Sequence, residues 1–209
     1  PTVKESFEQY LSSTLNAFKE SCCDCVLWEK VLGIAVSVPG PYYAEEDKVI
    51  NNLVPELCNI KLKHLLQQHF PNTLIYIDQD TSHAARYVGF HEIPSPYVFY
   101  TYIGRGVSGA IFYNGSLLKS AFSYAGEFGQ FRHGHKVNIE QRISTNNLKR
   151  FFPNHREVDG PYSKGKCSYP DALKEYIEEV AVILADVLCD ITWLIDPQVI
   201  AIESVYNQL

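Results

Sequence analysis

Two short apolar runs, separated by a helical pattern, most constrain what this chain can fold into. Residues 31–38 (VLGIAVSV) are β-branched and end at a Pro-Gly-Pro turn, and residues 73–77 (TLIYI) form a second run of the same type. Between them, the apolar side chains of residues 62–70 have the spacing of a short helix that Pro71 ends. A strand, a helix and a strand in this order predict an α/β fold with an open sheet.

Polar residues follow the second run directly, as Asp78-Gln79-Asp80. In an open α/β sheet, ligands bind beyond the carboxyl ends of the strands, where side chains project between the crossover connections. We therefore expect a ligand site at these three residues. One alternative stays open, in which Asp80 caps the amino end of the next helix.

The pattern changes to hairpins beyond Pro94 and Pro96, where consecutive X-Pro units favour extended chain. The predicted strands and turn are residues 97–103, residues 108–113, a type I′ turn at Asn114-Gly115 and residues 116–119. Three sequential antiparallel strands are therefore expected. The change of pattern predicts one lobe at residues 1–93 and a second at residues 94–209.

Helical patterns and a last strand account for much of the remaining chain. Phe7, Leu11, Leu15 and Phe18 lie on one face of an amphipathic helix. The other predicted elements are a helix at 138–150, a long and largely buried helix at 173–194, and a final strand at 199–202.

Charge and hydropathy exclude two classes of function. The formal net charge is −6 and the isoelectric point lies near 5.6, with Lys and Arg scattered, so we expect no direct nucleic-acid binding by these residues. No run reaches the ~18 uncharged apolar residues of a membrane span, and the acidic start is unlike a signal peptide. We expect a cytoplasmic protein.

Three of the six cysteines are crowded together, at Cys22, Cys23 and Cys25. The other three stand alone, which is unlike the disulfide framework of a secreted protein. The crowded group is at most half of a zinc site, because no second ligand pair follows at a suitable spacing. The alternative is a set of free thiols at a helix end.

Seven segments, taken in order, resemble the ROK family of repressors, open reading frames and sugar kinases. They are GIAVSVPGP (33–41), INNL (50–53), DQDTSHAA (78–85), YTYIGRGVSGAIFYNGSLL (100–118), AGEFGQ (125–130), NIEQRIS (138–144) and LIDPQVI (194–200). The resemblance spans almost the whole chain. It implies an actin-like, ribonuclease-H-like sugar-kinase fold with two lobes, the first truncated at its N-terminus, and a sugar in the cleft.

The resemblance implies sugar contacts at the end of the second strand. In the family kinases, the aspartate of a Glu-Asn-Asp-Ala-Asn motif deprotonates the sugar hydroxyl that attacks the γ-phosphate, and Asp80 holds that position. Gln79 replaces the family's sugar-binding asparagine and is longer by one methylene. Asn52, in the loop that matches the family's Asn-Leu, is a further candidate contact.

Two later glutamates match sugar-binding carboxylates of the family, Glu127 in the AGEFGQ segment and Glu140 in NIEQRIS. Gln130 replaces a histidine that contacts sugar and zinc; a glutamine can bond a hydroxyl but is a poor zinc ligand. The family's cysteine cluster is also absent, so we predict no structural zinc. His133 and His135 could bind a metal in principle, the alternative being solvated loop histidines.

The turn at Gly104-Arg105-Gly106 lies where the kinases have a Gly-Thr-Gly-x-Gly-Gly phosphate loop. Glycines let backbone amides approach phosphate oxygens, so these residues and Gly109 are the candidate cofactor-binding residues. Arg105 replaces the family's threonine and is large enough to fill the nucleotide site. A plain hairpin turn is the alternative.

The nucleotide site departs from the family elsewhere too. Where the kinases have a Gly-Gly pair beside the adenosine, residues 202–205 are Ile-Glu-Ser-Val, which would obstruct the nucleotide and place a carboxylate near it. The kinases' opening phosphate-binding hairpin is also missing. We therefore expect no cofactor, with ATP and Mg²⁺ required only if the protein is a kinase.

These expectations favour the effector-binding and oligomerisation domain of a ROK-type transcriptional regulator. It would bind a sugar or sugar phosphate, form a homodimer or higher homo-oligomer, and reach DNA only through a missing N-terminal helix-turn-helix. The absence of methionine favours a fragment of a longer protein. The alternatives are a fragment of an ATP-dependent sugar kinase of the glucokinase or N-acyl-hexosamine kinase type, and a domain that binds no ligand and only holds a dimer together.

Overall fold

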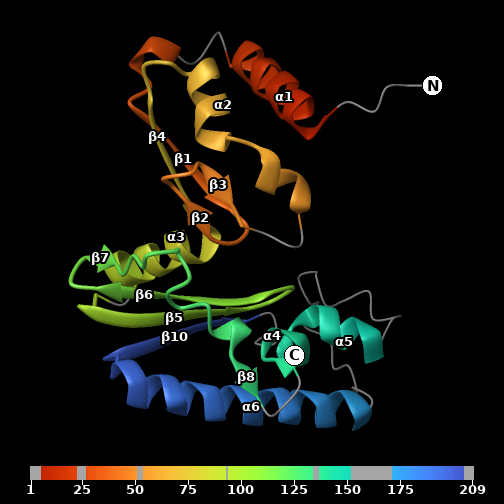
Figure 1. The fold of residues 1–209 in the computed structure, drawn as a ribbon. Coiled ribbons are helices and arrows are strands. Elements are labelled where there is room, and N and C mark those ends of the chain that lie inside the picture. The colour runs from red at the N-terminus through yellow and green to blue at the C-terminus, as the bar shows by residue number, and fades with distance from the viewer. Residues whose placement is uncertain are drawn as a thin grey trace. The chain divides into compact units, whose positions relative to one another are not determined.

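The computed structural model describes residues 6–22, 27–50, 54–92, 94–133, 137–151 and 171–204 (Figure 1). Contacts divide the chain into two compact units. Pro1–His83 with Ala121–Ser123 form the first unit, and Ala84–Ser120 with Tyr124–Leu209 form the second. This division falls inside helix α3 (Asp80–Tyr87). The lobe boundary at 93/94 stays a prediction, because a compact unit need not coincide with a lobe of the fold.

The first unit contains a parallel pair of strands with two helices on one face. β1 (Gly33–Val38) and β4 (Leu74–Gln79) pair along their whole length, and α1 (Phe7–Ser21) and α2 (Leu62–His69) pack against them. The shared core includes Val38, Leu62, Leu65, Leu66, Phe70, Ile75 and Ile77, with Phe7, Leu11 and Leu15 packed against it. The predicted strand, helix and strand, and the amphipathic first helix, are confirmed.

Side chains alternate between the two faces of this small sheet. Ile75 and Ile77 are buried under the helices, whereas Leu74 is 79% exposed and Tyr76 is 37% exposed. Short elements complete the unit: the 3₁₀ turns η1 (Trp28–Lys30) and η2 (Pro55–Asn59), and the small antiparallel pair β2 (Tyr42–Tyr43) and β3 (Lys48–Val49). One face of the sheet is therefore covered and the other carries exposed apolar side chains.

The second unit is built on a four-stranded sheet in the order β10-β5-β6-β7. Its strands are β5 (Tyr97–Ile103), β6 (Val107–Tyr113), β7 (Ser116–Leu117) and β10 (Val199–Ser204). The three predicted sequential strands are antiparallel to one another, and β10 pairs with β5 in parallel. Asn114 and Gly115 both have positive φ, as the predicted type I′ turn requires.

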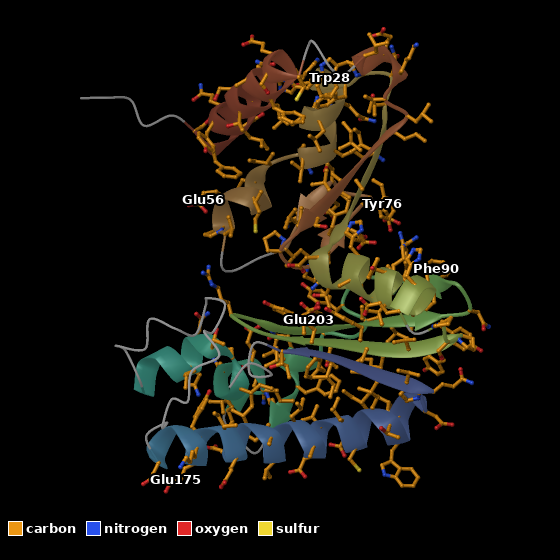
Figure 2. The ribbon with its side chains drawn as sticks, turned by 180° about the vertical axis from the view of Figure 1, so that it is seen from behind. Trp28, Glu56, Tyr76, Phe90, Glu175 and Glu203 are labelled. Atoms are coloured by element: carbon orange, nitrogen blue, oxygen red, sulfur yellow. The ribbon has the colours of Figure 1, made fainter. Side chains whose placement is uncertain are left out.

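Helices cover both faces of this sheet. α6 (Asp171–Ile195) runs along one face and buries Tyr176, Val180, Ile183, Val187 and Ile191 against side chains of β5 and β6 (Figure 1). Its outer face is solvent-exposed, and Figure 2 shows Glu175 pointing away from the sheet. On the opposite face, Ala85 of α3 and Val88 of the π-helical turn η3 (Val88–Glu92) pack on Tyr100, Ala110 and Phe112.

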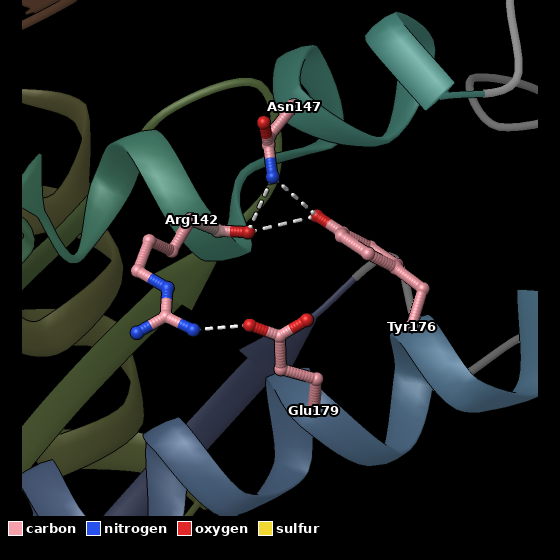
Figure 3. A network of polar contacts seen from close by, with 4 residues as sticks. All are labelled: Arg142, Asn147, Tyr176 and Glu179. Atoms are coloured by element: carbon pink, nitrogen blue, oxygen red, sulfur yellow. Dashed lines mark hydrogen bonds and ion pairs between the residues drawn. The ribbon is translucent and has the colours of Figure 1, made fainter.

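The helix predicted at 138–150 is wrong, because two short helices occupy this stretch. α4 (Glu140–Ile143) ends at Ser144, which has extended backbone, and α5 (Thr145–Phe151) follows. Hydrogen bonds stabilise the break between the two helices. The Tyr176 hydroxyl and the Asn147 amide both donate to the carbonyl of Arg142, at 2.9 and 2.8 Å, and Arg142 pairs with Glu179 of α6 (Figure 3). Sequence periodicity does not register such partners.

The remaining short elements are a 3₁₀ turn, η4 (Phe128–Gln130), and the two-residue strands β8 (Arg132–His133) and β9 (Val137–Asn138). Within the described part of the chain, no helix is both long and apolar enough to cross a membrane. Cys22 caps the end of α1, but Cys23 and Cys25 lie outside the described residues.

Candidate functional site

Glycines hold the segment that contains Glu127 close against strand β6. A Cβ atom on Gly126 would lie 2.6 Å from the carbonyl oxygen of Gly109, and one on Gly109 would lie 2.7 Å from that of Gly126. Gly129 meets the carbonyl of Val107 in the same way. Because only glycine permits such backbone contacts, the AGEFGQ segment lies directly on the start of β6.

Glu127 is held by a side chain of β6. The hydroxyl of Ser108 donates to Oε1 of Glu127 over 2.8 Å. The neighbouring Phe128 is fully buried in the core of the second unit, which anchors the backbone beside the carboxylate. The carboxylate of Glu127 is therefore fixed at the beginning of β6.

Glu140 is held by a backbone group of Val107, the residue before Ser108. The backbone N–H of Val107 donates to Oε2 of Glu140 over 3.0 Å, and a Cβ atom on Gly106 would lie 3.2 Å from the same oxygen. The structure thus brings Glu127 and Glu140, two of the sequence-predicted site residues, to consecutive positions of one strand.

The turn between β5 and β6 also accepts hydrogen bonds from Thr145 and Asn146, at the start of α5. Gly104 donates to the carbonyl of Gly106 over 2.9 Å, and its own carbonyl accepts from the N–H of Thr145 over 2.8 Å. The side-chain amide of Asn146 donates to the carbonyl of Arg105 over 3.0 Å. The hydroxyl of Tyr102 occupies the space beside the Cα of Gly104.

These contacts determine how well the turn fits a nucleotide phosphate. A phosphate-binding loop needs unpaired backbone N–H groups and an open approach to its glycines. Here Glu140 takes the N–H of Val107, while Tyr102 and Glu140 occupy the space beside Gly104 and Gly106. The glycines at 104 and 106 therefore accommodate the protein's own side chains, and the N–H groups of Gly104 and Val107 are bonded within the protein. Arg105 is exposed.

Gln130 ends the 3₁₀ turn that follows Glu127. It is exposed, and its Oε1 accepts from the side-chain amide of Asn138 over 3.0 Å. On β10, Glu203 accepts a hydrogen bond from the hydroxyl of Tyr100, so it adds a third carboxylate to the second unit's sheet (Figure 2). The position of Val205, also predicted to obstruct a nucleotide, lies outside the described residues.

The first unit carries the other predicted site residues. Asp80 begins α3, is exposed, and accepts from the N–H and the hydroxyl of Thr81 at 2.7 and 3.2 Å. Gln79 ends β4 and is buried. Asp78 accepts from the N–H of Gln79 and from the hydroxyl of Tyr76, at 2.9 and 2.8 Å. The position of Asn52 lies outside the described residues.

No group of three or more His, Cys, Asp and Glu side chains that could hold a metal ion occurs in the part of the chain that the structure describes. His135 and the side chain of His133 lie outside it. Sequence reasoning did not single out Ser108, which donates a hydrogen bond to Glu127. The signal was present, because Ser108 stands where the kinase phosphate-loop pattern has a glycine.

Comparisons with known proteins place these features in context. The model of the ROK family matches residues 1–149. An uncharacterised protein of Clostridium perfringens is 25% identical over 181 residues; the match covers 82% of this chain, which spans 61% of that relative's length.

Solved structures match nearly the whole chain. A ROK family transcriptional regulator, a homologue of the E. coli MLC protein, is 18% identical with a TM-score of 0.74, over 96% of this chain and 56% of that one. A ROK family glucokinase from Streptomyces griseus, in complex with glucose and AMPPNP, is 18% identical with a TM-score of 0.69, over 96% and 73%. At these identities the likenesses show the fold, which is the actin-like fold of the ROK sugar kinases.

Proposed function

This chain belongs to the ROK family, and on that premise we propose that it is the sugar-sensing, effector-binding and oligomerisation domain of a transcriptional regulator without kinase activity. The observation that carries the proposal is the pair of carboxylates, Glu127 and Glu140, held by consecutive residues of β6 beside a turn whose Gly104 and Val107 N–H groups are bonded within the protein. Carboxylate acceptors for hydroxyl groups are retained, whereas two backbone donors of the turn are already used within the protein.

Carboxylates suit the recognition of a sugar. An ionised carboxylate has about four acceptor positions, so Glu127 and Glu140 can each accept from a sugar hydroxyl while keeping the hydrogen bond to β6. Asp80, Gln79 and Asn52 are the proposed contacts from the first unit. Gln130 supplies a donor and an acceptor.

Electrostatics support binding without phosphoryl transfer. Glu127, Glu140 and Glu203 bring three negative side chains to the second unit's sheet, and like charges repel the phosphates of a nucleotide. Catalysis of phosphoryl transfer depends on donors and cations that neutralise the developing charge. An aspartate at position 80 could accept the proton of a sugar hydroxyl, but it cannot replace the donors and cations that bind the phosphates.

A regulator of this kind works by differential binding. A sugar that binds one arrangement of the domain better than another shifts the population towards it, and a homodimer can pass that shift to DNA-binding segments. The chain spans 56% of the matched regulator's length, which leaves room for such a segment in a longer protein. Cytoplasmic location, self-association and contact with DNA through an upstream helix-turn-helix are parts of the same proposal.

The second candidate is a sugar kinase, and a specific observation favours it: Asp80 begins α3 directly after β4, at the position that matches the kinase base. A coupled assay of ADP release by the longest natural form of the protein, with ATP, Mg²⁺ and a panel of hexoses and amino sugars, separates the two candidates. We expect sugar binding without turnover. Sugar-dependent ADP release would replace the regulator by the kinase.

Calorimetry against the same panel tests binding itself. Asp80→Ala and Glu127→Ala should each raise the Kd of the bound sugar about tenfold or more, because each loses a hydrogen bond to a charged group. Glu178→Ala is the matched control, since Glu178 is exposed on the outer face of α6. If no sugar binds, the domain only holds an assembly together; if both variants bind like the parent, the assigned site is wrong.

A further inference from the structure

We propose that Ser108 is a positioning residue that orients the carboxylate of Glu127 for a sugar hydroxyl. The inference deepens the proposed function and rests on it. It begins from the 2.8 Å hydrogen bond between the Ser108 hydroxyl and Oε1 of Glu127. Neither composition nor periodicity assigns a role to Ser108.

The hydrogen bond from Ser108 limits the freedom of the Glu127 side chain. Glu127 precedes the 3₁₀ turn η4, and its side chain makes no capping bond to that turn. Its backbone is pinned through Gly126 and Phe128, but a glutamate side chain has several rotatable bonds beyond the backbone. An acceptor that is free to rotate loses entropy when it binds a ligand, so a fixed carboxylate binds more tightly.

Ser108 is a suitable holder because its own position is rigid. It lies in β6 opposite Tyr102 of β5, inside a ladder that continues to Tyr113. A serine has one side-chain torsion to its hydroxyl oxygen, and a hydroxyl that donates to a carboxylate forms a short, charge-assisted bond. An ionised carboxylate has about four acceptor positions, so it can accept from more than one donor.

The neighbouring Glu140 shows the same design with a different donor. Its carboxylate is held by the backbone N–H of Val107, which side-chain substitution does not remove. The first two residues of β6 therefore each hold one of the two carboxylates. The contact of Glu127, by contrast, comes from a side chain that substitution can remove, so Ser108 is the residue to test.

The experiment measures sugar affinity by calorimetry in the full chain for Ser108→Ala, Ser108→Thr and the control Ser116→Ala. Ser116 is exposed on β7 of the same sheet. We expect Ser108→Ala to raise the Kd of the sugar that the parent binds about tenfold. Ser108→Thr keeps the hydroxyl and should restore the affinity to within about threefold of the parent, and Ser116→Ala should leave it unchanged.

Thermal unfolding of each variant distinguishes lost positioning from lost folding. If Ser108→Ala and Ser108→Thr have similar midpoints but only the alanine variant binds weakly, the positioning role is supported. Equal affinities of parent and Ser108→Ala overturn it and leave the proposed function intact. If the parent binds no sugar of the panel, the proposed function fails, and the positioning role fails with it.

Discussion

At the scale of single residues, Asp47 shows how a distant carboxylate replaces a missing helix cap. The residue before α2, Lys61, makes no side-chain capping bond. The two carboxylate oxygens of Asp47 instead accept from the backbone N–H groups of Lys63 and His64, each over 2.9 Å. Asp47 has a positive φ of 48°, which aspartate tolerates better than most residues.

Tyr42 shares this carboxylate, and its ionisation predicts how stability changes with pH. Burial, followed by the hydrogen bond to Asp47, raises the pKa of the Tyr42 hydroxyl above its ordinary value. Because the folded-state pKa is the higher one, the contribution to stability is complete below about pH 10 and is lost as pH rises towards the folded-state value.

Urea unfolding of the parent and of Tyr42→Phe between about pH 8 and about pH 11 measures this contribution. The free energy of unfolding of the parent should fall more steeply above about pH 10 than that of the phenylalanine variant, which has no hydroxyl to ionise. Parallel pH profiles for the two proteins would contradict the assignment.

Residue-scale contacts of this kind are what sequence reading recovers least. Asp47 lies 16 residues from Lys63, and Ser108 lies 19 residues from Glu127. Motif order identified Glu127 and Glu140 because their own chemistry is informative. Their partners on β6 are a serine and a backbone N–H, whose roles depend on the fold that brings them close.

At the scale of elements, the glycines at 109, 126 and 129 let the segment 125–130 lie on β6 by backbone contact. Gly126 and Gly115 form a matched pair for testing this, since both have positive φ, at 94° and 78°. An added Cβ at Gly126 meets the backbone of Gly109, whereas one at Gly115 meets nothing within 4 Å. The two positions differ in surroundings while sharing left-handed backbone.

Gly115→Ala should therefore cost about 1 kcal/mol in the free energy of unfolding, from backbone strain alone. Gly126→Ala should cost about 2 kcal/mol more, because the segment must move away from β6, and it should also weaken sugar binding. Urea unfolding and calorimetry measure both effects. Equal destabilisation by the two substitutions would show that the close backbone contact contributes nothing.

Element prediction succeeded where local chemistry decides the structure. Asn114-Gly115 specifies its turn without help from distant residues, and the antiparallel strands on both sides were predicted from it. The helix at 138–150 failed because its break at Ser144 is satisfied by Tyr176 and by the turn at Gly104, both distant along the chain. Periodicity alone favours the continuous helix.

At the scale of the whole molecule, the predicted site residues are distributed over both compact units. Asp80 and Gln79 belong to the first, and Glu127, Gln130 and Glu140 belong to the second. The resemblance to the ROK family is the basis for predicting sugar contacts in both groups. The binding of Glu127 and Glu140 to consecutive residues of β6 required the fold, because 12 residues lie between them in the sequence.

The two units should also differ in stability. The first has a two-stranded parallel sheet with one exposed face, although parallel sheets are normally buried on both faces and isolated strand pairs are marginal. The second has four strands covered on both faces by helices. Trp28 reports on the first unit, since it packs between Phe18 and Phe70 with ring centroids 5.6 Å apart in both contacts.

In a Trp193→Phe variant, Trp28 is the only tryptophan, and the loss of Trp193 should be nearly neutral because that side chain is 86% exposed. We expect the Trp28 fluorescence to change at a lower urea concentration than the hydrogen exchange of the β5 and β6 amides, because the first unit opens before the second. Coincident transitions for the two signals would mean that the units unfold as one cooperative structure, in which the exposed sheet face of the first unit costs no independent stability.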